Sequence, residues 1–426
     1  MAARRAAIKR LNALIADKQG QLRQLEAQND DLRIRLAGLH LTWRCLQELC
    51  AHRAAHGADT GELELQSQRI EAHFAAALAG LAEHSQGSGG SGGGSGGARL
   101  CTPPSPTLSG SSGGEAYNAG SEGSGAAAVA LEGEISRRLA GSVLAALPHL
   151  APGATLLHLE SVTADDVAHF KALSVPAVVA RWSNLMREAR AISEAIRTVD
   201  AQAEALRAQP QAGLSDAQAA AEGQQLDQRR ERLSADLYAS GLRIKKFYNL
   251  ITIWNFSVFA EAGASNFETR EATGGTRDAP LSHWESVVRS SEVTKNQARI
   301  TTDVHRSYRA RIAALHEERA TLSAHLSAAA AEAAAAPPGA EAAAMGFRGE
   351  ATERQGRVVE ALDENINAER SAWLLFALFS VALLSPRQTA RLWSSAFPWP
   401  MHTPLCCRIL EHDLRFNSEG FAAASD

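Results

Sequence analysis

The sequence predicts an all-α protein in which an N-terminal coiled coil, a leucine zipper, is joined by a disordered Gly/Ser linker to an irregular helical bundle. Aromatic residues make up only 5% of the 426 residues, whereas the strands of a β-sandwich or barrel draw heavily on aromatic and β-branched residues. A heptad repeat of apolar residues runs from Ile8 to Leu39, as in coiled coils. A run rich in glycine and serine follows, and helical patterns resume beyond it.

Changes in composition divide the chain into four segments. Residues 1–84 are expected to form the leucine zipper and a helical extension, and residues 85–128 the linker, because Gly, Ser and Pro cannot bury enough apolar surface to become ordered. Residues 129–384 are expected to form a helical region that carries an Ala-rich low-complexity insert at 326–345. Residues 385–426 are expected to form a short C-terminal helix and tail.

The heptad repeat of the first segment predicts an interface with another helix. Apart from Lys18 and Asn29, the residues at positions a and d are apolar, and a sustained repeat of this kind indicates a coiled coil. The same spacing continues through Trp43, Leu46 and Cys50. The residues predicted to form the dimer interface are Ile8, Leu11, Ile15, Leu22, Leu25, Asn29, Leu32, Leu36 and Leu39.

Asn29 predicts the form of the coiled coil. An asparagine at position a lowers stability, but in a parallel dimer the two amides bind each other and fix the register. The sequence therefore predicts a parallel homodimer or heterodimer. The flanking pairs across a parallel homodimer set no like charges against each other; they are Gln21–Glu26, Gln28–Arg33 and Arg35–His40. The alternative is that this helix packs on the chain's own bundle with Asn29 at a solvated edge.

Residues 3–39, ARRAAIKRLNALIADKQGQLRQLEAQNDDLRIRLAGL, resemble the zipper half of basic leucine zipper proteins, above all the Ala-rich proteins of green algae. Three distal stretches add to the resemblance: HWESVVRS from His283, RSYRARIAALHEERATLSAHL from Arg306, and LLSPRQTARLWSSAFPW from Leu383. The resemblance implies a dimeric, DNA-binding transcriptional regulator of the nucleus, with the cytoplasm as the alternative location.

The basic region of that family is truncated or degenerate here. The family reads bases through an asparagine and an arginine upstream of the zipper. When Asn29 is aligned with the usual zipper asparagine, the arginine position falls on Ile8 and the asparagine position precedes Met1. As written, the base-reading motif is absent.

Four cations, Arg4, Arg5, Lys9 and Arg10, remain at the start of the zipper. On two paired helices they would contact phosphates of double-stranded DNA without reading its sequence. They fit equally well a nuclear-import patch or a plain solvated helix end. The predicted function is thus a dimerising regulator that contacts DNA through this patch or through pairing with full-length relatives. The alternative is a structural coiled-coil scaffold that binds no DNA.

No motif supports an enzyme, a metal site or a cofactor. The G-x-G-x-x-G pattern at 87–92 neither follows a strand nor opens a helix. The densest set of potential zinc ligands is His40, Cys45, Cys50, His52 and His56. On a continuous helix, however, Cys45 and Cys50 point about 140° apart, and no second Cys pair completes a tetrahedral site.

Charge and hydropathy exclude several other classes. A net charge of −4 excludes a globally basic nucleic-acid coat. Five scattered cysteines indicate a reducing compartment. The apolar run Ala372–Leu384 is shorter than the ~20 residues that a membrane helix needs, so we expect a buried helix and no membrane partner.

Within the second helical region, the sequence predicts particular elements. Ser282 and Glu285 have the spacing of a capping box, and the apolar residues from Val287 to Leu322 recur as on one helix. Ser385 followed by Pro386 predicts an N-cap with proline at the first helical position. The stretch Phe247–Phe259 is expected to be a core helix.

Overall fold

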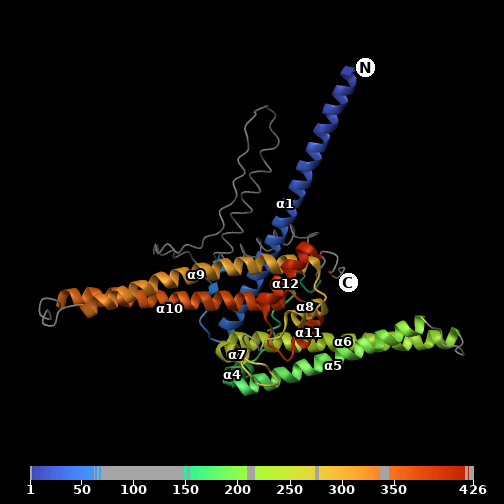
Figure 1. The fold of residues 1–426 in the computed structure, drawn as a ribbon. Helices are drawn as coiled ribbons and strands as arrows, with labels where there is room; N and C mark the ends of the chain where they lie inside the picture. The colour runs from blue at the N-terminus through green and yellow to red at the C-terminus, as the bar shows by residue number, and fades with distance from the viewer. Residues whose placement is uncertain are drawn as a thin grey trace. The chain divides into compact units, whose positions relative to one another are not determined.

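The computed structural model confirms the all-α prediction (Figure 1). It describes residues 2–61, 63–64, 67–68, 148–150, 154–208, 216–273, 278–335, 345–417 and 421. These residues form ten α-helices and no strand, and Ser265 and Ala272 form an isolated β-bridge. The predicted linker at 85–128 lies outside the described residues.

The helices belong to two compact units. Unit 1 comprises the described residues within 1–59, 139–306 and 374–426, and unit 2 comprises those within 60–138 and 307–373. A 3₁₀ turn, η2, covers Pro148–Leu150. The α-helices are α1 (Ala2–Ala55), α4 (Ala164–Ala172), α5 (Val175–Ala208), α6 (Asp216–Trp254), α7 (Phe256–Ala262), α8 (Leu281–Ser290), α9 (Lys295–Ala335), α10 (Met345–Ala382), α11 (Pro386–Ala396) and α12 (Thr403–Phe416).

The core of unit 1 is built where α6 packs against α5 and α11. Trp182 of α5 lies edge-on to Trp393 of α11, with their ring centroids 4.8 Å apart, a favourable geometry for aromatic pairs. Tyr248 of α6 lies 5.2 Å from the same Trp393 ring. Gly241 lets α6 approach α11 closely, because a Cβ atom there would clash with the backbone oxygen of Pro386.

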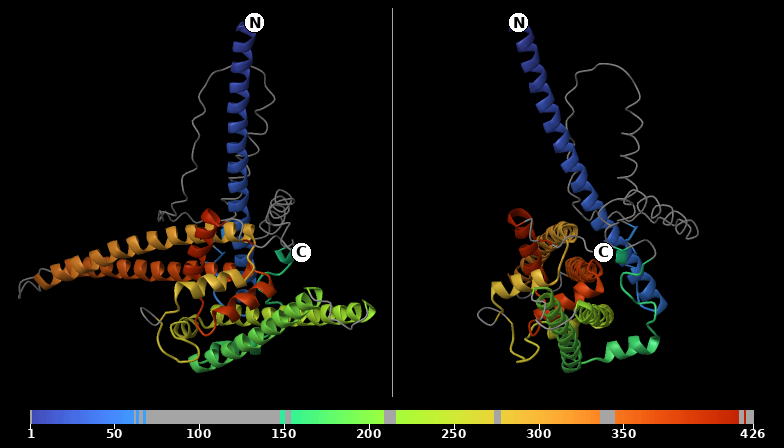
Figure 2. Two further views of the ribbon diagram at one scale, coloured as in Figure 1. Left: turned by 45° about the vertical axis from the view of Figure 1, so that its right-hand side comes forward. Right: turned by 90° about the vertical axis from the view of Figure 1, so that its right-hand side faces the viewer.

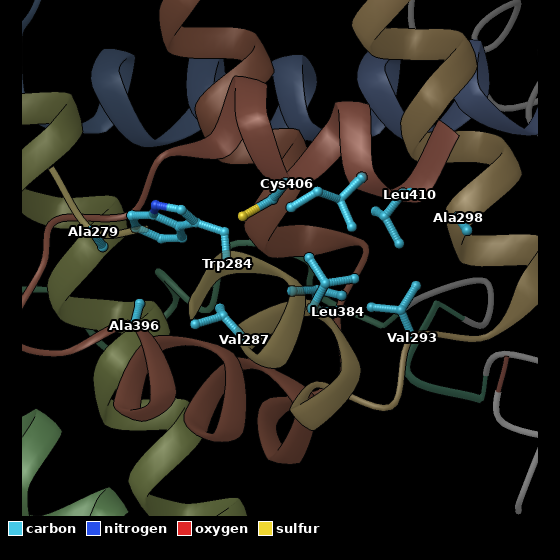
Figure 3. Close-up of a cluster of buried hydrophobic side chains, with 11 residues drawn as sticks. Ala279, Trp284, Val287, Val293, Ala298, Leu384, Ala396, Cys406 and Leu410 are labelled. Carbon is cyan, nitrogen blue, oxygen red and sulfur yellow. The ribbon is translucent and has the colours of Figure 1, made fainter. Parts of the chain in front are cut away.

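A second buried cluster of unit 1 joins α8 and α12 to neighbouring segments (Figure 3). Trp284 and Val287 of α8 lie in it together with Cys406 and Leu410 of α12 and Leu384, which follows α10. These side chains are 8% exposed or less, so α8 and α12 are held by their apolar faces.

In unit 2, α9 and α10 form an antiparallel pair. The buried Asn365 of α10 donates through Nδ2 to the backbone oxygen of Leu315, at 3.0 Å. Its Oδ1 atom accepts from Nε of Arg319, also at 3.0 Å. Arg319 and His316 both contact the Glu369 carboxylate. This polar network fixes the register of the two helices.

Two predictions about helix starts had different outcomes. The start of α11 is confirmed: Ser385 is the N-cap, Pro386 is the first helical residue, and Gln388 completes a capping box. The Ser282 capping box is wrong, because α8 begins after Pro280 and has no side-chain cap.

The single helix predicted from Val287 to Leu322 is two helices, α8 and α9. The second helix starts with its own box, in which the Gln297 amide N–H donates to Thr294 Oγ1 and the Thr294 N–H donates to Gln297 Oε1. The apolar residues recur at helical spacing both before and after Thr294, but the capping motif at Thr294 ends one helix and starts the next.

The predicted core helix Phe247–Phe259 is helical and buried in part. It contains the end of α6 and the start of α7, which are separated at Asn255. The Asn255 side chain donates to the backbone oxygens of Phe170 and Leu173 at 3.1 and 3.0 Å, so the break joins α6 to the end of α4. The predicted Ala-rich insert is helical up to Ala335.

The apolar run Ala372–Leu384 forms the end of α10 and the two residues after it, and most of its side chains from Leu374 onward are buried. Among the described helices, none is by itself long and apolar enough to cross a membrane. The segments Glu353–Ala382 and Pro386–Ala396 reach the required length and hydropathy only together, and they meet at a bend of 112°.

Candidate functional site

Helix α1 has an exposed first half and a buried second half. It is continuous over 54 residues, and its N-terminal half extends away from the other helices of unit 1 (Figure 2). Apolar side chains on this half are largely exposed, for example Ile8 at 50%, Leu25 at 61% and Leu32 at 57%. Such a row of exposed leucines is a feature of interaction surfaces.

The predicted interface residues form one stripe on this half, which we call the zipper stripe. Asn29 lies exposed in the same row, and Leu36 is half-buried. The exposed apolar members are Ile8, Leu11, Ile15, Leu22, Leu25, Leu32 and Leu39, and Leu14 beside them is exposed as well. The structure therefore places the predicted residues together on one face and leaves that face open.

Near the end of the stripe, between Ile34 and Leu41, the opposite face of α1 packs against α9. Ile34 and Leu41 are buried, and a Cβ atom at Gly38 would lie 2.8 Å from Cγ2 of Val304. At 100° per residue, these positions lie roughly 160° around the helix from Leu32, Leu36 and Leu39. The contact with α9 thus leaves the zipper stripe uncovered.

Ion pairs support the same contact between α1 and α9. Arg299 binds the carboxylates of Asp30 and Asp31, and Arg35 lies 3.7 Å from Asp303. Sequence reasoning missed this second face. The apolar residues Ile34, Ala37, Leu41 and Cys45 recur at three- and four-residue steps, which is the signal that would have found it.

The zipper stripe ends at Leu39, earlier than the heptad spacing predicts. Trp43 and Leu46, which continue the a and d positions, are 1% and 0% exposed. Leu41, Arg44 and Cys45 are buried too, so α1 is enclosed over this part of its length. The expectation that the seam with a second chain continues through Trp43 and Leu46 is wrong, because the chain's own core occupies these residues.

The predicted flanking pair Arg35–His40 is also wrong as a contact open to a second chain. Arg35 binds Asp303 of its own chain, and His40 is 3% exposed. Burial lowers the pKa of His40 to about 4, with a smaller effect from Arg44. The alternative expectation, packing on the chain's own bundle, describes α1 from about Asp30 onward, where it contacts α9 and then the core, and not the part of the helix before it.

Buried polar contacts hold the second half of α1 in unit 1. The Glu48 carboxylate accepts from the backbone N–H groups of Leu156 and Leu157 at 2.9 Å each, and Arg44 donates to the backbone oxygen of Leu150 at 3.0 Å. His52 Nε2 accepts from the Trp254 indole N–H at 3.0 Å. These contacts fix the position from which the exposed half projects.

Lys245 is an ionisable residue in the core that the sequence did not single out. It is 1% exposed, on α6, with Cys45 and Glu48 of α1 as ionisable neighbours. Burial lowers the pKa of Lys245 to about 7, and the two neighbours offset part of this shift. Burial also raises the pKa of the Glu48 carboxyl, as expected for groups removed from water.

The four predicted phosphate contacts, Arg4, Arg5, Lys9 and Arg10, are all exposed on the first turns of α1. Within the described residues, no group of three His, Cys, Asp or Glu side chains has metal-binding geometry. The rings of His52 and His56 lie edge-on to Trp254.

Comparison with protein-family models, curated proteins and solved structures gives no match for this chain.

Proposed function

We propose that this chain is a dimerising regulator of the basic leucine zipper type. Its α1 helix would pair in parallel through the zipper stripe with the zipper of a full-length relative, and the chain would act mainly by changing how that relative binds DNA. The observation that carries the proposal is the exposed apolar stripe from Ile8 to Leu39, which stays uncovered even where the other face of the helix packs against α9, from Ile34 to Leu41.

The composition of the stripe supports pairing with another helix. Exposed apolar surface in water is costly, at about 25 cal/mol per Å², and a row of leucines at positions a and d is what a zipper buries. The α9 contact supports it further, because a partner can cover the stripe without displacing Val304 or Arg299.

The basic residues would act on the DNA backbone. In a parallel pair, Arg4, Arg5, Lys9 and Arg10 lie beside the basic region of the partner. Lys and Arg at this place neutralise phosphates and add affinity that depends on salt. They add no base reading, because the position of the family's arginine is occupied by Ile8.

A gel-shift titration tests the proposal. A full-length relative with an intact basic region is bound to its DNA site, and this chain is added. We expect the original complex to be replaced by a heterodimer complex or by free DNA. A shift that stays unchanged at saturating protein would reject the proposal. A variant with Leu25→Ala and Leu32→Ala is the matched negative control.

The alternative function is a coiled-coil scaffold without DNA contact. The residue Ile8 at the family's base-reading position favours it. The two functions predict different outcomes for DNA binding at low salt: the heterodimer binds DNA if the chain is a regulator and does not if it is a scaffold. Fluorescence anisotropy with labelled duplex DNA measures this difference: a scaffold gives no signal, whereas the regulator gives binding that weakens steeply as salt is added.

A further inference from the structure

We propose that two copies of this chain pair through the zipper stripe in antiparallel orientation, in place of the parallel homodimer expected from the sequence. The inference rests on the proposed function in so far as the stripe is a zipper surface. It concerns self-pairing, and it leaves parallel pairing to heterodimers with a different zipper.

One antiparallel register matches the whole stripe to itself. In antiparallel coiled coils, each residue at position a packs against a residue at position d of the partner. With the two-fold axis between Arg23 and Gln24, every apolar residue of the stripe meets an apolar residue of the second copy. The layers are Ile8 with Leu39, Leu11 with Leu36, Ile15 with Leu32, and Leu22 with Leu25.

The same register pairs the two polar residues of the stripe with each other. Asn29 of one copy faces Lys18 of the second, and the reverse holds across the axis. The Asn29 side-chain oxygen can accept from the Lys18 ammonium group. A parallel homodimer instead sets Lys18 against Lys18, which places like charges in the centre of the seam and disfavours that pairing.

The residues that flank the seam are compatible with this arrangement. The flanking pairs contain no like charges; they are Gln21 with Gln28, Gln19 with Glu26, Asn12 with Arg33, and Leu14 with Arg35. Leu14, which is 54% exposed, would lie along the aliphatic part of the Arg35 side chain. Arg35 keeps its ion pair with Asp303 because that pair is intramolecular.

The enclosure of α1 beyond Leu39 gives an independent steric argument. Helices of a coiled coil lie about 8–10 Å apart. In a parallel homodimer, two copies of the enclosed segment around Trp43 and Leu46 would meet at the same end and force the helices apart. In the antiparallel register, residues 41–46 of one copy face only residues 1–6 of the other, so the enclosed segment meets a single helix end and not a second enclosed segment.

Self-pairing of this kind would have a regulatory consequence. It buries the complete stripe and holds Arg4, Arg5, Lys9 and Arg10 of the two copies at opposite ends of the coiled coil. Such a homodimer cannot place the four cations of both copies side by side on one DNA site. A parallel partner becomes favourable when its residue opposite Lys18 is apolar or acidic, which defines the kind of zipper that this chain would select.

Disulfide trapping on the full chain distinguishes the orientations. Variants Ile15→Cys and Leu32→Cys are made with Cys50→Ser and Cys101→Ser, are mixed, and are oxidised; Cys45, Cys406 and Cys407 are buried. We expect 15–32 links on peptide mapping, and the variant without an added cysteine is the control. Links of 15–15 and 32–32 would overturn the antiparallel arrangement while preserving the zipper.

A charge design gives a second, independent test, in a variant that carries both Lys18→Glu and Asn29→Lys. In the antiparallel register, the new carboxylate at position 18 of each copy faces the new ammonium group at position 29 of the other. A parallel homodimer instead sets the two carboxylates against each other and the two ammonium groups against each other. We expect sedimentation velocity to show that the variant still dimerises, with a Kd no more than about threefold higher than that of the unmodified chain. A variant that becomes monomeric overturns the proposal.

Failure of the inference and failure of the proposed function are distinguishable. An unmodified chain that stays monomeric at high micromolar concentration overturns the antiparallel homodimer. The gel-shift titration with a full-length relative still decides the proposed function, because a heterodimer forms or does not form independently of self-pairing.

Discussion

Truncation of two leucines in the zipper stripe is the most direct test of the role of α1. We consider the variant with Leu25→Ala and Leu32→Ala. These side chains are 61% and 57% exposed, and exposed substitutions usually change the stability of a monomer by no more than ~0.5 kcal/mol. We therefore expect the free energy of unfolding of the monomer to stay nearly constant.

The dimer should respond very differently. Full burial of a leucine is worth about 1.5–3 kcal/mol, and somewhat more than half of each side chain remains to be buried on pairing. This amounts to ~1–2 kcal/mol per side chain, or ~4–7 kcal/mol for the four side chains of a dimer. Since 1.4 kcal/mol is about a factor of ten in Kd, the dimer should weaken by about 10³–10⁵-fold.

Sedimentation equilibrium over a range of concentrations measures the Kd, and thermal unfolding monitored by circular dichroism measures the fold. Leu281→Ala is the matched control, because Leu281 is 55% exposed at the start of α8 and away from the stripe. A change in Kd of less than tenfold, or an equal effect of Leu281→Ala, would refute the reasoning.

Two further predictions concern unit 1. Burial, with a smaller contribution from His56, lowers the pKa of His52 to about 4 from an ordinary value of 6.5. The unfolded chain thus binds this proton more tightly, so stability should fall as the pH drops from about 6.5 to about 4. Urea titrations should show a shallower fall for His52→Gln, which can still accept from Trp254; an unchanged slope would contradict this. Gly241→Ala should destabilise by about 1–3 kcal/mol or more, because its Cβ meets the backbone of Pro386. Gly223→Ala in the same helix has room and should stabilise by up to about 1 kcal/mol; equal midpoints for the two variants would argue against the close approach.

Local sequence patterns predicted the fold class and the helical spacing of the apolar residues on α1, because both depend on the periodicity of the residues within one helix. The N-cap at Ser385 was predictable for the same reason, since proline and serine act on the adjacent backbone. The Ser282 motif has equally good spacing, but α8 starts before it. Spacing alone does not determine which of two nearby starts the chain uses, because tertiary contacts choose between them.

The end of the stripe and the core lysine could not be predicted. A heptad pattern reports that a face is apolar, and it does not distinguish the chain's own core from a second chain. Trp43 and Leu46 therefore look like a continuation of Leu36 and Leu39. Lys245 is adjacent to Lys246 in the sequence, and only the three-dimensional packing distinguishes the buried residue from its more exposed neighbour.

The continuity of α1 has a mechanical consequence. No break interrupts the helix between its embedded end and its free end, so the segment from Ile8 to Leu39 behaves as a stiff rod of about 47 Å, at 1.5 Å per residue. A partner bound to this segment is therefore held at a fixed distance and a fixed rotational angle from unit 1, in which the other end of α1 is buried. Insertion of a single residue after the stripe, between it and the buried part of α1, would rotate the zipper stripe by about 100° relative to unit 1.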